Sequence, residues 1–261
     1  MTRPIALVTG ASSGIGESFA RLLAQRGHDL VLVARDEGRL DAVAKEVADL
    51  HGAAAHVMRA DLTVPEQLGF VEERCRDSDA PVELLVNNAG FGSFGAFHTL
   101  DLDTEIREIQ LNVVALVRLT HAAVSQMVPR GRGGIINVSS LAGYQPGPMN
   151  ATYGATKAFV TSFTEAVHEE LKDTGVAITA LCPGFTRTGF QETASVPASS
   201  VPGFMWQDAD EVARAGLDAV ARNRAVATPG PLNTTLGLFT QMAPNAITRR
   251  MAAAVIKRSA S

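Results

Sequence analysis

The segment that decides the fold is Ile5-Ala6-Leu7-Val8-Thr9-Gly10-Ala11-Ser12-Ser13-Gly14-Ile15-Gly16. Its apolar start predicts a first strand over Ile5–Thr9, and a helix-periodic stretch over Ile15–Gln25 follows at once. The glycines between them allow a tight turn and let the backbone approach a pyrophosphate, which the helix N-terminus then stabilises. The spacing is G-x-x-x-G-x-G, and an ordinary strand-to-helix turn is the alternative interpretation. Its place at the first such junction of an alternating pattern favours nucleotide binding.

The alternation of short apolar runs with longer helical stretches continues along the chain. Leu30-Val31-Leu32-Val33 is apolar on both faces, which is typical of a parallel sheet covered by helices on both sides. The further predicted strands are Leu30–Ala34, Ala55–Arg59, Leu84–Asn87, Gly134–Ser139, Val176–Cys182 and Ala225–Thr228. The further predicted helices are Glu37–Leu50, Pro65–Arg76, Thr104–Met127, Ala151–Asp173 and Ala209–Arg222. The pattern predicts an α/β fold, a doubly wound parallel sheet of about seven strands with helices on both faces.

Length and irregular stretches indicate the domain organisation. The 261 residues favour a single domain, 1–261. Residues 188–206, rich in Pro, Ser, Gly and large apolar side chains, predict a lid-like substrate loop, because loops this long in compact domains are usually functional. Residues 232–261 are interpreted as a helical C-terminal tail. Its basic end (Arg249, Arg250, Lys257 and Arg258) is expected at a subunit contact, with a membrane surface as the alternative.

Composition excludes several classes of protein. The chain is 46% hydrophobic and 19% charged with a net charge of −4, which excludes disorder and gives no sign of nucleic-acid binding. With Cys75 and Cys182 as the cysteines, a disulfide scaffold is excluded too. No apolar run approaches the ~18 residues of a spanning helix, so no transmembrane segment and a cytoplasmic location are expected. The histidines show no ligand spacing, so no metal is expected.

Several motifs occur in order: Thr9–Gly16, Asn87-Asn88-Ala89-Gly90, Tyr153-x-x-x-Lys157 and Pro183-Gly184. Together they resemble the short-chain dehydrogenases/reductases, from about Ile5 to about Thr228. The resemblance implies a Rossmann-type fold and an oxidoreductase that transfers a hydride between a nicotinamide cofactor and a carbonyl or alcohol. The cofactor-binding residues that it implies are Gly10, Ser12, Ser13, Gly14, Ile15, Gly16, Arg35, Asp61, Leu62, Asn88, Ala89, Gly90, Tyr153, Lys157, Pro183, Gly184, Thr186 and Thr188.

The candidate catalytic residues are Asn112, Ser140, Tyr153 and Lys157. Tyr153 and Lys157 lie one turn apart on the same face of a predicted helix. Free tyrosine ionises near pH ~10, and a neighbouring lysine cation and the oxidised nicotinamide both favour the phenolate, so Tyr153 is the expected general acid/base. By resemblance, Ser140 hydrogen-bonds the substrate oxygen, with Ser139 as the competing assignment. Asn112, also by resemblance, supports a water that links Lys157 to solvent.

The end of the second predicted strand, Val33-Ala34-Arg35-Asp36, bears on the choice of cofactor. Ala34 stands where NAD-dependent members of the family usually carry Asp, and the guanidinium of Arg35 can bind a 2′-phosphate through two parallel hydrogen bonds. Asp36 is adjacent, Ser13 stands where many NADPH-dependent relatives have a second basic residue, and an Arg35 that points to solvent is the alternative. NADP(H) is therefore favoured over NAD(H).

The segments after the predicted strands indicate the substrate. Phe91–Phe97, Leu141–Tyr144, Met149 and Phe190–Trp206, the last with Val196, Val201, Phe204, Met205 and Trp206, predict mostly apolar pocket walls. The alternative is that these side chains only pack the loops against the body. The expected substrate is a hydrophobic ketone, aldehyde or secondary alcohol, such as an oxoacyl chain, a steroid-like compound or an aryl carbonyl.

The same residues also bear on two alternative functions and on the assembly. A non-catalytic NADP(H)-binding sensor is disfavoured because all four catalytic residues are present. A sugar-nucleotide epimerase or dehydratase is disfavoured by the glycine spacing and by the absence of an extra C-terminal domain. By resemblance, Thr104–Met127 and Ala151–Asp173 form a four-helix contact across a two-fold axis, so a homodimer or homotetramer is expected. The candidate apolar residues of that contact are Val117, Val124, Phe159 and Phe163.

Overall fold

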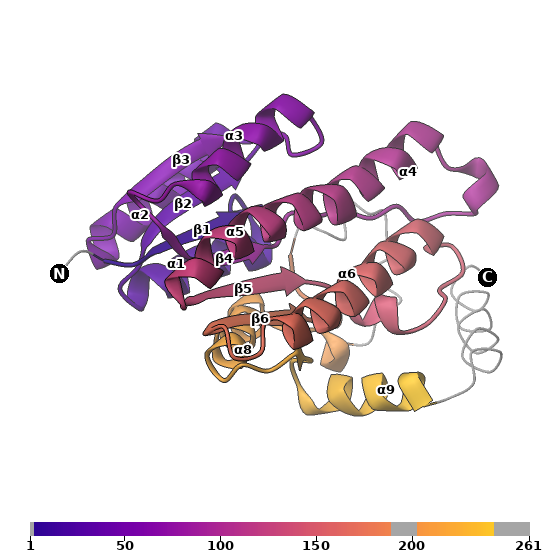
Figure 1. The fold of residues 1–261 in the computed structure, drawn as a ribbon. Helices are drawn as coiled ribbons and strands as arrows, with labels where there is room; N and C mark the ends of the chain where they lie inside the picture. Colours follow the sequence, from indigo (N-terminus) through magenta and orange to yellow (C-terminus); the bar gives the residue numbers. More distant parts are fainter. Residues whose placement is uncertain (1–2, 189–202, 243–261) are drawn as a thin grey trace.

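A computed structural model describes residues 3–188 and 203–242 of the chain (Figure 1). Its centre is a seven-stranded parallel sheet with the strand order β3-β2-β1-β4-β5-β6-β7, which confirms the predicted doubly wound α/β fold. The strands are β1 (Ile5–Thr9), β2 (Asp29–Ala34), β3 (Ala55–Arg59), β4 (Val82–Asn87), β5 (Gly133–Val138), β6 (Val176–Leu181) and β7 (Val226–Ala227). Their positions agree with the sequence prediction, although β7 is shorter because only its pairing with β6 at two positions is formed.

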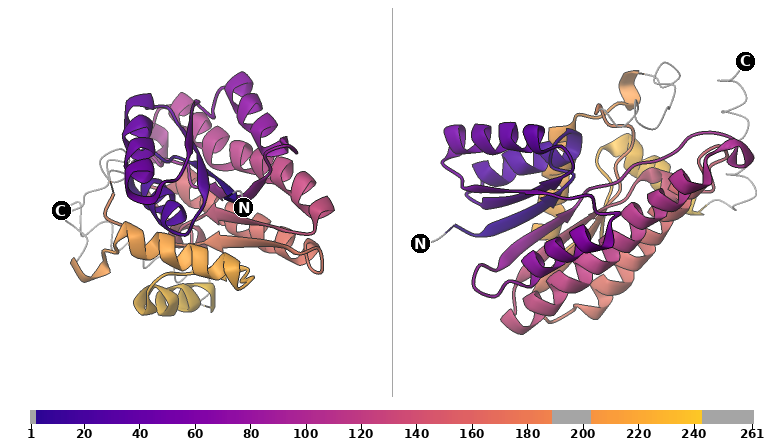
Figure 2. Two further views of the ribbon diagram at one scale, coloured as in Figure 1. Left: turned by 90° about the vertical axis from the view of Figure 1, so that its left-hand side faces the viewer. Right: turned by 90° about the horizontal axis from the view of Figure 1, so that it is seen from above.

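Helices cover both faces of this sheet (Figure 2). They are α1 (Gly14–Gln25), α2 (Glu37–His51), α3 (Pro65–Arg76), α4 (Leu102–Ile109), α5 (Leu116–Arg130), α6 (Ala151–Glu170), α8 (Ala209–Ala221) and α9 (Pro231–Met242). Short 3-10 turns lie at Phe97–Thr99 (η1), Leu141–Tyr144 (η3) and Gly203–Met205 (η5). Helices α1, α2 and α8 pack on one face and α3, α5 and α6 on the other. Both faces of the strands are therefore buried, as the unbroken apolar runs predicted.

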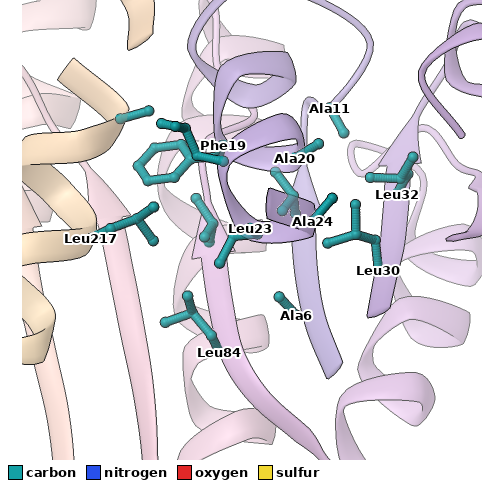
Figure 3. Close-up of a cluster of buried hydrophobic side chains, with 14 of the residues drawn as sticks. Ala6, Ala11, Phe19, Ala20, Leu23, Ala24, Leu30, Leu32, Leu84 and Leu217 are labelled. Carbon is teal, nitrogen blue, oxygen red and sulfur yellow. The ribbon is translucent and has the colours of Figure 1, made fainter. Parts of the chain in front are cut away.

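The alternation of side chains along each strand divides the core between the two faces. On β1, Ala6 and Val8 join the cluster under α1 and α8, whereas Leu7 joins the cluster under α3 and α5. Figure 3 shows the first cluster, in which the ring of Phe19 from α1 lies beside Leu217 of α8. These side chains are fully or almost fully buried, which contributes roughly 2–3 kcal/mol for each large one. The packing fixes the carboxyl ends of the strands, where the candidate site lies.

The predicted helix Thr104–Met127 is longer and less regular than the sequence indicated. Helix α4, a π-helical segment at Gln110–Ala115 (η2) and α5 form one continuous helical stretch from Leu102 to Arg130. A π turn shifts the backbone hydrogen bonds by one residue, and such turns often occur at functional sites. Asn112 lies inside it.

By length and composition this stretch, Leu102–Arg130, is the one described helix that could cross a membrane. It packs against α3, β4 and β5, which accounts for the buried part of its apolar surface. Several predictions fall outside the described residues. They concern residues 189–202 of the lid-like loop, with Phe190, Val196 and Val201, and residues 243–261 of the tail, with its basic end.

Candidate active site

The strand order reverses at β1, whose neighbours are β2 and β4, and the candidate site lies at this switch point. Thr9 and Asn88 join the carboxyl ends of β1 and β4. The Thr9 hydroxyl accepts hydrogen bonds from the backbone N–H groups of Asn88 and Ala89, both at 3.0 Å, and the Asn88 amide donates to the Thr9 carbonyl at 3.0 Å. Ligands of doubly wound folds bind in the crevice at such a point.

The glycine turn after β1 has the backbone shape that its sequence predicted. Gly10 and Gly14 have φ values of +66° and +56°, a region that side chains disfavour. At Gly16 a Cβ would lie 2.2 Å from the Gly10 carbonyl oxygen, so no larger residue fits there. Ser13 is the N-cap of α1 and makes no side-chain capping bond, and Ser12 and Ile15 complete the turn. The turn leaves backbone N–H groups at the helix start available to an anion.

The end of β2 lies beside this turn, because the Gly10 N–H donates to the Val33 carbonyl at 2.8 Å. Arg35 is exposed two residues further on. Asp36, the acidic neighbour that weighed against an NADP site, is the N-cap of α2. It accepts the Arg39 backbone N–H at 3.0 Å and pairs with the Arg39 guanidinium at 3.4 Å. The carboxylate of Asp36 is thus held by its own helix rather than by Arg35.

The predicted adenine-site residues, Asp61 and Leu62, follow β3. Asp61 accepts the backbone N–H and the hydroxyl of Thr63 at 2.9 and 2.7 Å, and these bonds, with Arg35 nearby, hold its pKa below the usual range although burial opposes them. Leu62 is buried in the core on the α3 side. Only the backbone of Leu62 is therefore in a position to line a binding site.

Ser140, Tyr153, Lys157 and Asn112 come together from β5, α6 and the π turn. Ser140, the second residue after β5, is hydrogen-bonded to the Tyr153 hydroxyl. The Lys157 ammonium donates to the Val138 carbonyl at 2.8 Å and lies 5.6 Å from the centre of the Tyr153 ring. A Cβ at Gly90, after β4, would lie 2.9 Å from Asn112 Oδ1 and 3.5 Å from Lys157 Nζ, so these two groups share one small space.

The competing serine, Ser139, is occupied elsewhere. It is buried, donates to the Lys157 carbonyl at 2.7 Å and lies 2.7 Å from the Thr161 hydroxyl. It therefore anchors the strand to α6, while Ser140 is the serine that reaches Tyr153. The Asn112 side chain is likewise fixed, because its amide donates to the Phe91 carbonyl at 2.8 Å and its oxygen accepts the Phe91 N–H at 3.1 Å.

Burial governs the protonation of this group. It raises the pKa of Tyr153 to about 12, against the effect of the Ser140 hydrogen bond, and the Glu108 carboxylate raises it further. Burial also lowers the pKa of Lys157 to about 8, while Glu108 opposes that shift. At neutral pH the tyrosine is therefore a phenol, able to donate a proton, and the lysine beside it is mostly charged.

Two buried glutamates of α4, Glu105 and Glu108, belong to this neighbourhood although sequence analysis did not select them. Glu108 accepts the Ser93 backbone N–H at 2.9 Å, and Glu105 accepts the hydroxyls of Ser93 and Thr152. Burial raises the pKa of Glu108 to about 7. Glu105 and Glu108 carry no distinct sequence signal, because the same helix also contains Asp103 and Arg107.

The segment after β6 lies between the residues that follow β5 and the glycine turn. The Pro183 carbonyl accepts the Leu141 N–H at 3.0 Å, and Thr186 is buried, with its hydroxyl bonded to the Gly184 carbonyl at 3.1 Å. A Cβ at Gly14 would lie 2.8 Å from Thr188 Cγ2, so Thr188 reaches the glycine turn.

Two residues from other elements contact this segment, and neither of them belongs to a sequence motif. The Gln207 side chain accepts the Gly184 N–H at 3.2 Å and donates to the Pro229 carbonyl at 2.8 Å. Asn233 of α9 also donates to the Pro229 carbonyl, at 3.1 Å, and is buried. The Gln207 side chain thus connects the segment after β6 to the start of α9, and a Cβ at Gly184 would lie 2.6 Å from the Asn233 side chain.

Of the predicted pocket walls, the described residues follow the carboxyl ends of β4, β5 and β6. Phe91, Phe94, Tyr144 and Met149 are half-buried. The Tyr144 hydroxyl lies 3.3 Å from that of Thr228. Two further aromatic side chains, Phe185 and Trp206, contact each other with ring centres 5.8 Å apart, and Phe204 is 76% exposed. Apolar side chains thus gather at the end of the sheet where the Tyr153 hydroxyl lies.

The comparisons with known proteins identify relatives among the short-chain dehydrogenases. The family model of the short chain dehydrogenases matches residues 4–197. An uncharacterized oxidoreductase of Staphylococcus epidermidis is 34% identical over 188 residues, which are 72% of this chain and 80% of that protein.

Two solved structures share the fold over almost the whole chain. A short-chain dehydrogenase from Sphingobium yanoikuyae in complex with NADPH is 38% identical with a TM-score of 0.83, covering 92% of this chain and 96% of that one. The bulky-bulky ketone specific alcohol dehydrogenase from Comamonas testosteroni is 33% identical with a TM-score of 0.78, covering 94% and 97%.

Proposed function

Because the chain belongs to the short-chain dehydrogenase/reductase family, whose members act on carbonyl and alcohol groups, we propose that it transfers a hydride between NADP(H) and a bulky, hydrophobic ketone, aldehyde or secondary alcohol. The observation that carries the proposal is the convergence of Ser140, Tyr153 and Lys157 beside the glycine turn. Ser140 is bonded to the tyrosine hydroxyl, and the lysine lies against its ring.

The glycine turn fits a dinucleotide. The positive φ values of Gly10 and Gly14, the space kept free at Gly16 and the uncapped start of α1 form a cradle that side chains would fill. The pyrophosphate would be held by the residues of this turn, namely Gly10, Ser12, Ser13, Gly14, Ile15 and Gly16. The Thr188 side chain lies next to Gly14. The bound nicotinamide supplies the hydride that the chain's own side chains cannot.

The preference for NADP(H) rests on Arg35. Arg35 is exposed two residues after Val33, whose carbonyl accepts the Gly10 N–H, and its guanidinium can bind a 2′-phosphate through paired, charge-assisted hydrogen bonds. Asp36 does not compete for that guanidinium, because it caps α2 and pairs with Arg39. The related Sphingobium enzyme, whose complex contains NADPH, supports the same preference.

The residues of α6 and β5 supply the proton chemistry. The Ser140 hydroxyl is placed to donate a hydrogen bond to a carbonyl oxygen of the substrate, and this polarises the carbonyl. Tyr153, protonated at neutral pH, delivers a proton to that oxygen as hydride reaches the carbon, which leaves an alcohol and a phenolate. The charged Lys157 stabilises the phenolate until a proton from solvent restores the phenol.

The substrate class rests on the pocket walls. The apolar side chains that follow β4 and β5 are half-buried, namely Phe91, Phe94, Tyr144 and Met149. Phe185, after β6, contacts Trp206. Such walls favour a large apolar group over a sugar or a small acid. The related Comamonas enzyme, by its name specific for bulky-bulky ketones, supports this choice.

A homodimer or homotetramer completes the proposal. The continuous stretch of α4 and α5 lies alongside α6 (Figure 2). Apolar side chains of α4 and α6 are exposed, with Ile106 48%, Ile109 38% and Phe159 43% exposed. Of the residues expected there, Val117 and Phe163 are half-buried and Val124 packs partly against the core. An exposed apolar patch of this kind favours a subunit contact.

The direct test follows NADPH absorbance with a panel of aryl ketones, ketosteroids, 3-oxoacyl thioesters and small sugars. The proposal expects turnover of at least one hydrophobic carbonyl and NADPH use well above NADH use. Turnover of a small polar sugar alone would overturn the substrate class. NADPH binding without turnover of any compound in the panel, at several pH values, would favour the sensor function.

A further inference from the structure

Lys157 is a buried cation without a counter-ion in direct contact. It is 5% exposed, and its ammonium donates to the Val138 carbonyl. None of the ion pairs within 4.0 Å between described residues includes it. A lysine buried in this way tends to lose its proton, and pKa values of roughly 5–6 occur for fully buried lysines. Burial lowers the pKa of Lys157 to about 8, and the charge of Glu108 opposes this shift.

Glu108 is the acidic group that faces this lysine. It is fully buried, its Oε2 accepts the Ser93 N–H, and its Oε1 has no hydrogen-bond partner among the described residues. When the buried carboxyl is ionised, the charge on this unpaired oxygen needs a cation that stabilises it through space.

The segment 90–93 connects the two groups. A Cβ at Gly90 would lie 3.5 Å from Lys157 Nζ, and a Cβ at Gly92 would lie 2.7 Å from Cδ2 of the Tyr153 ring. Ser93, the next residue, donates its N–H to Glu108. The carboxylate is thus held directly behind the strip of backbone that touches both the lysine and the tyrosine.

The charged groups around Glu108 come from two helices. Glu105, on α4 itself, raises the pKa of Glu108, and Lys157, on α6, lowers it. Tyr153, also on α6, is neutral at these pH values. Above its pKa of about 7, Glu108 is a carboxylate, and its charge raises the pKa of Lys157; Cys182, which follows β6, acts on Lys157 in the same direction but less.

We propose that Glu108 is a positioning residue that keeps Lys157 protonated at pH values just above neutrality, acting as its counter-charge across the segment 90–93. This inference rests on the proposed function for its consequence, since a charged Lys157 is what stabilises the Tyr153 phenolate. The competing role for Glu108 is purely structural, namely to anchor the loop after β4 through the Ser93 N–H.

Three substitutions separate the effect of the Glu108 charge from the effect of its hydrogen bond to the Ser93 N–H. Glu108→Gln keeps an oxygen that can accept the Ser93 N–H but removes the charge. Glu108→Asp keeps the charge on a shorter side chain that reaches Ser93 poorly. Glu105→Gln is the matched control, because it removes a buried carboxylate of the same helix that binds the Ser93 and Thr152 hydroxyls.

The experiment is an NMR titration of the lysine side chains in the full chain without cofactor or substrate. The lysines of the sequence are Lys45, Lys157, Lys172 and Lys257, and Lys157→Arg identifies the resonance. We expect a Lys157 midpoint of about 8 in the unsubstituted protein and a fall of roughly one unit in Glu108→Gln. Glu108→Asp and Glu105→Gln should leave the midpoint near 8.

An unchanged midpoint in Glu108→Gln, or an equal fall in Glu105→Gln, would overturn the proposal. If Glu108→Gln does not fold, a midpoint that falls by a full unit in Glu108→Asp overturns it, and one that stays near 8 supports it. Because the titration needs no substrate, its failure is distinct from failure of the proposed function. With an active carbonyl in hand, the alkaline limb of kcat/KM should move to lower pH in Glu108→Gln and not in Glu105→Gln.

Discussion

Replacement of Gly92 by alanine tests whether the loop after β4 positions the Tyr153 ring. A Cβ at this position would lie 2.7 Å from Cδ2, 3.0 Å from Cγ and 3.3 Å from Cβ of Tyr153. Ordinary carbon–carbon contacts are about 3.5–4.0 Å, so the ring or the loop must move by roughly 1 Å. Displacements of that size at a reacting group cost up to about 100-fold in rate, so we expect kcat to fall by about 10- to 100-fold.

The substitution should spare the fold and the cofactor. Overpacking at one buried site costs about 1–3 kcal/mol, and the glycine turn after β1 is not in contact with Gly92. Gly95→Ala is the matched control in the same loop, because its Cβ would meet only the flexible end of Leu100, at 2.7 Å. Steady-state kinetics with NADPH, together with the NADPH dissociation constant, measure both effects. Wild-type kcat in Gly92→Ala would refute the idea that this loop sets the tyrosine position.

Three further predictions concern the cofactor preference, the pH dependence and the assembly. Arg35→Ala should narrow the preference for NADPH over NADH by roughly 10–100-fold, and equal use of both cofactors by the unsubstituted enzyme would refute the role of Arg35. Lys157 carries its charge below its pKa of about 8, so kcat/KM for reduction should be level near neutrality and fall as the pH rises through about 8; a profile unchanged through this range would contradict that. Ile106→Arg combined with Phe159→Arg should give a monomer by light scattering at micromolar concentration, whereas Phe70→Arg, on the exposed face of α3, should not; a monomeric unsubstituted protein would overturn the assembly.

The sheet and most helices could be predicted because local signals and the global fold agree. Leu30–Val33 is buried on both sides as its unbroken apolar run indicated, and Asp36 caps α2 while Gly52 ends it in the left-handed conformation. The π turn at Gln110–Ala115 could not be foreseen, because its residues have the same apolar pattern as a regular helix. Its cause lies in tertiary bonds, such as those between Asn112 and Phe91.

The candidate site shows the same division. Ser140, Tyr153 and Lys157 could be selected because each has a fixed place in a motif, and the hydrogen bond between Ser140 and Tyr153 distinguishes Ser140 from Ser139. Gln207 and Asn233 could not be selected from the sequence. Their side chains bond to the Pro229 backbone carbonyl, and no local residue pattern indicates such a bond. Glu108 was missed because a single glutamate in a helix usually faces solvent.

The most direct test of the central claim is the turnover of Tyr153→Phe with a hydrophobic carbonyl that the unsubstituted enzyme reduces. The phenyl ring fills the same space, so the fold and the NADPH dissociation constant should be unchanged. Without the hydroxyl that Ser140 contacts, no group at this position can deliver the proton, and kcat should fall by at least about 100-fold. Reduction by Tyr153→Phe at close to the unsubstituted rate would contradict the mechanism.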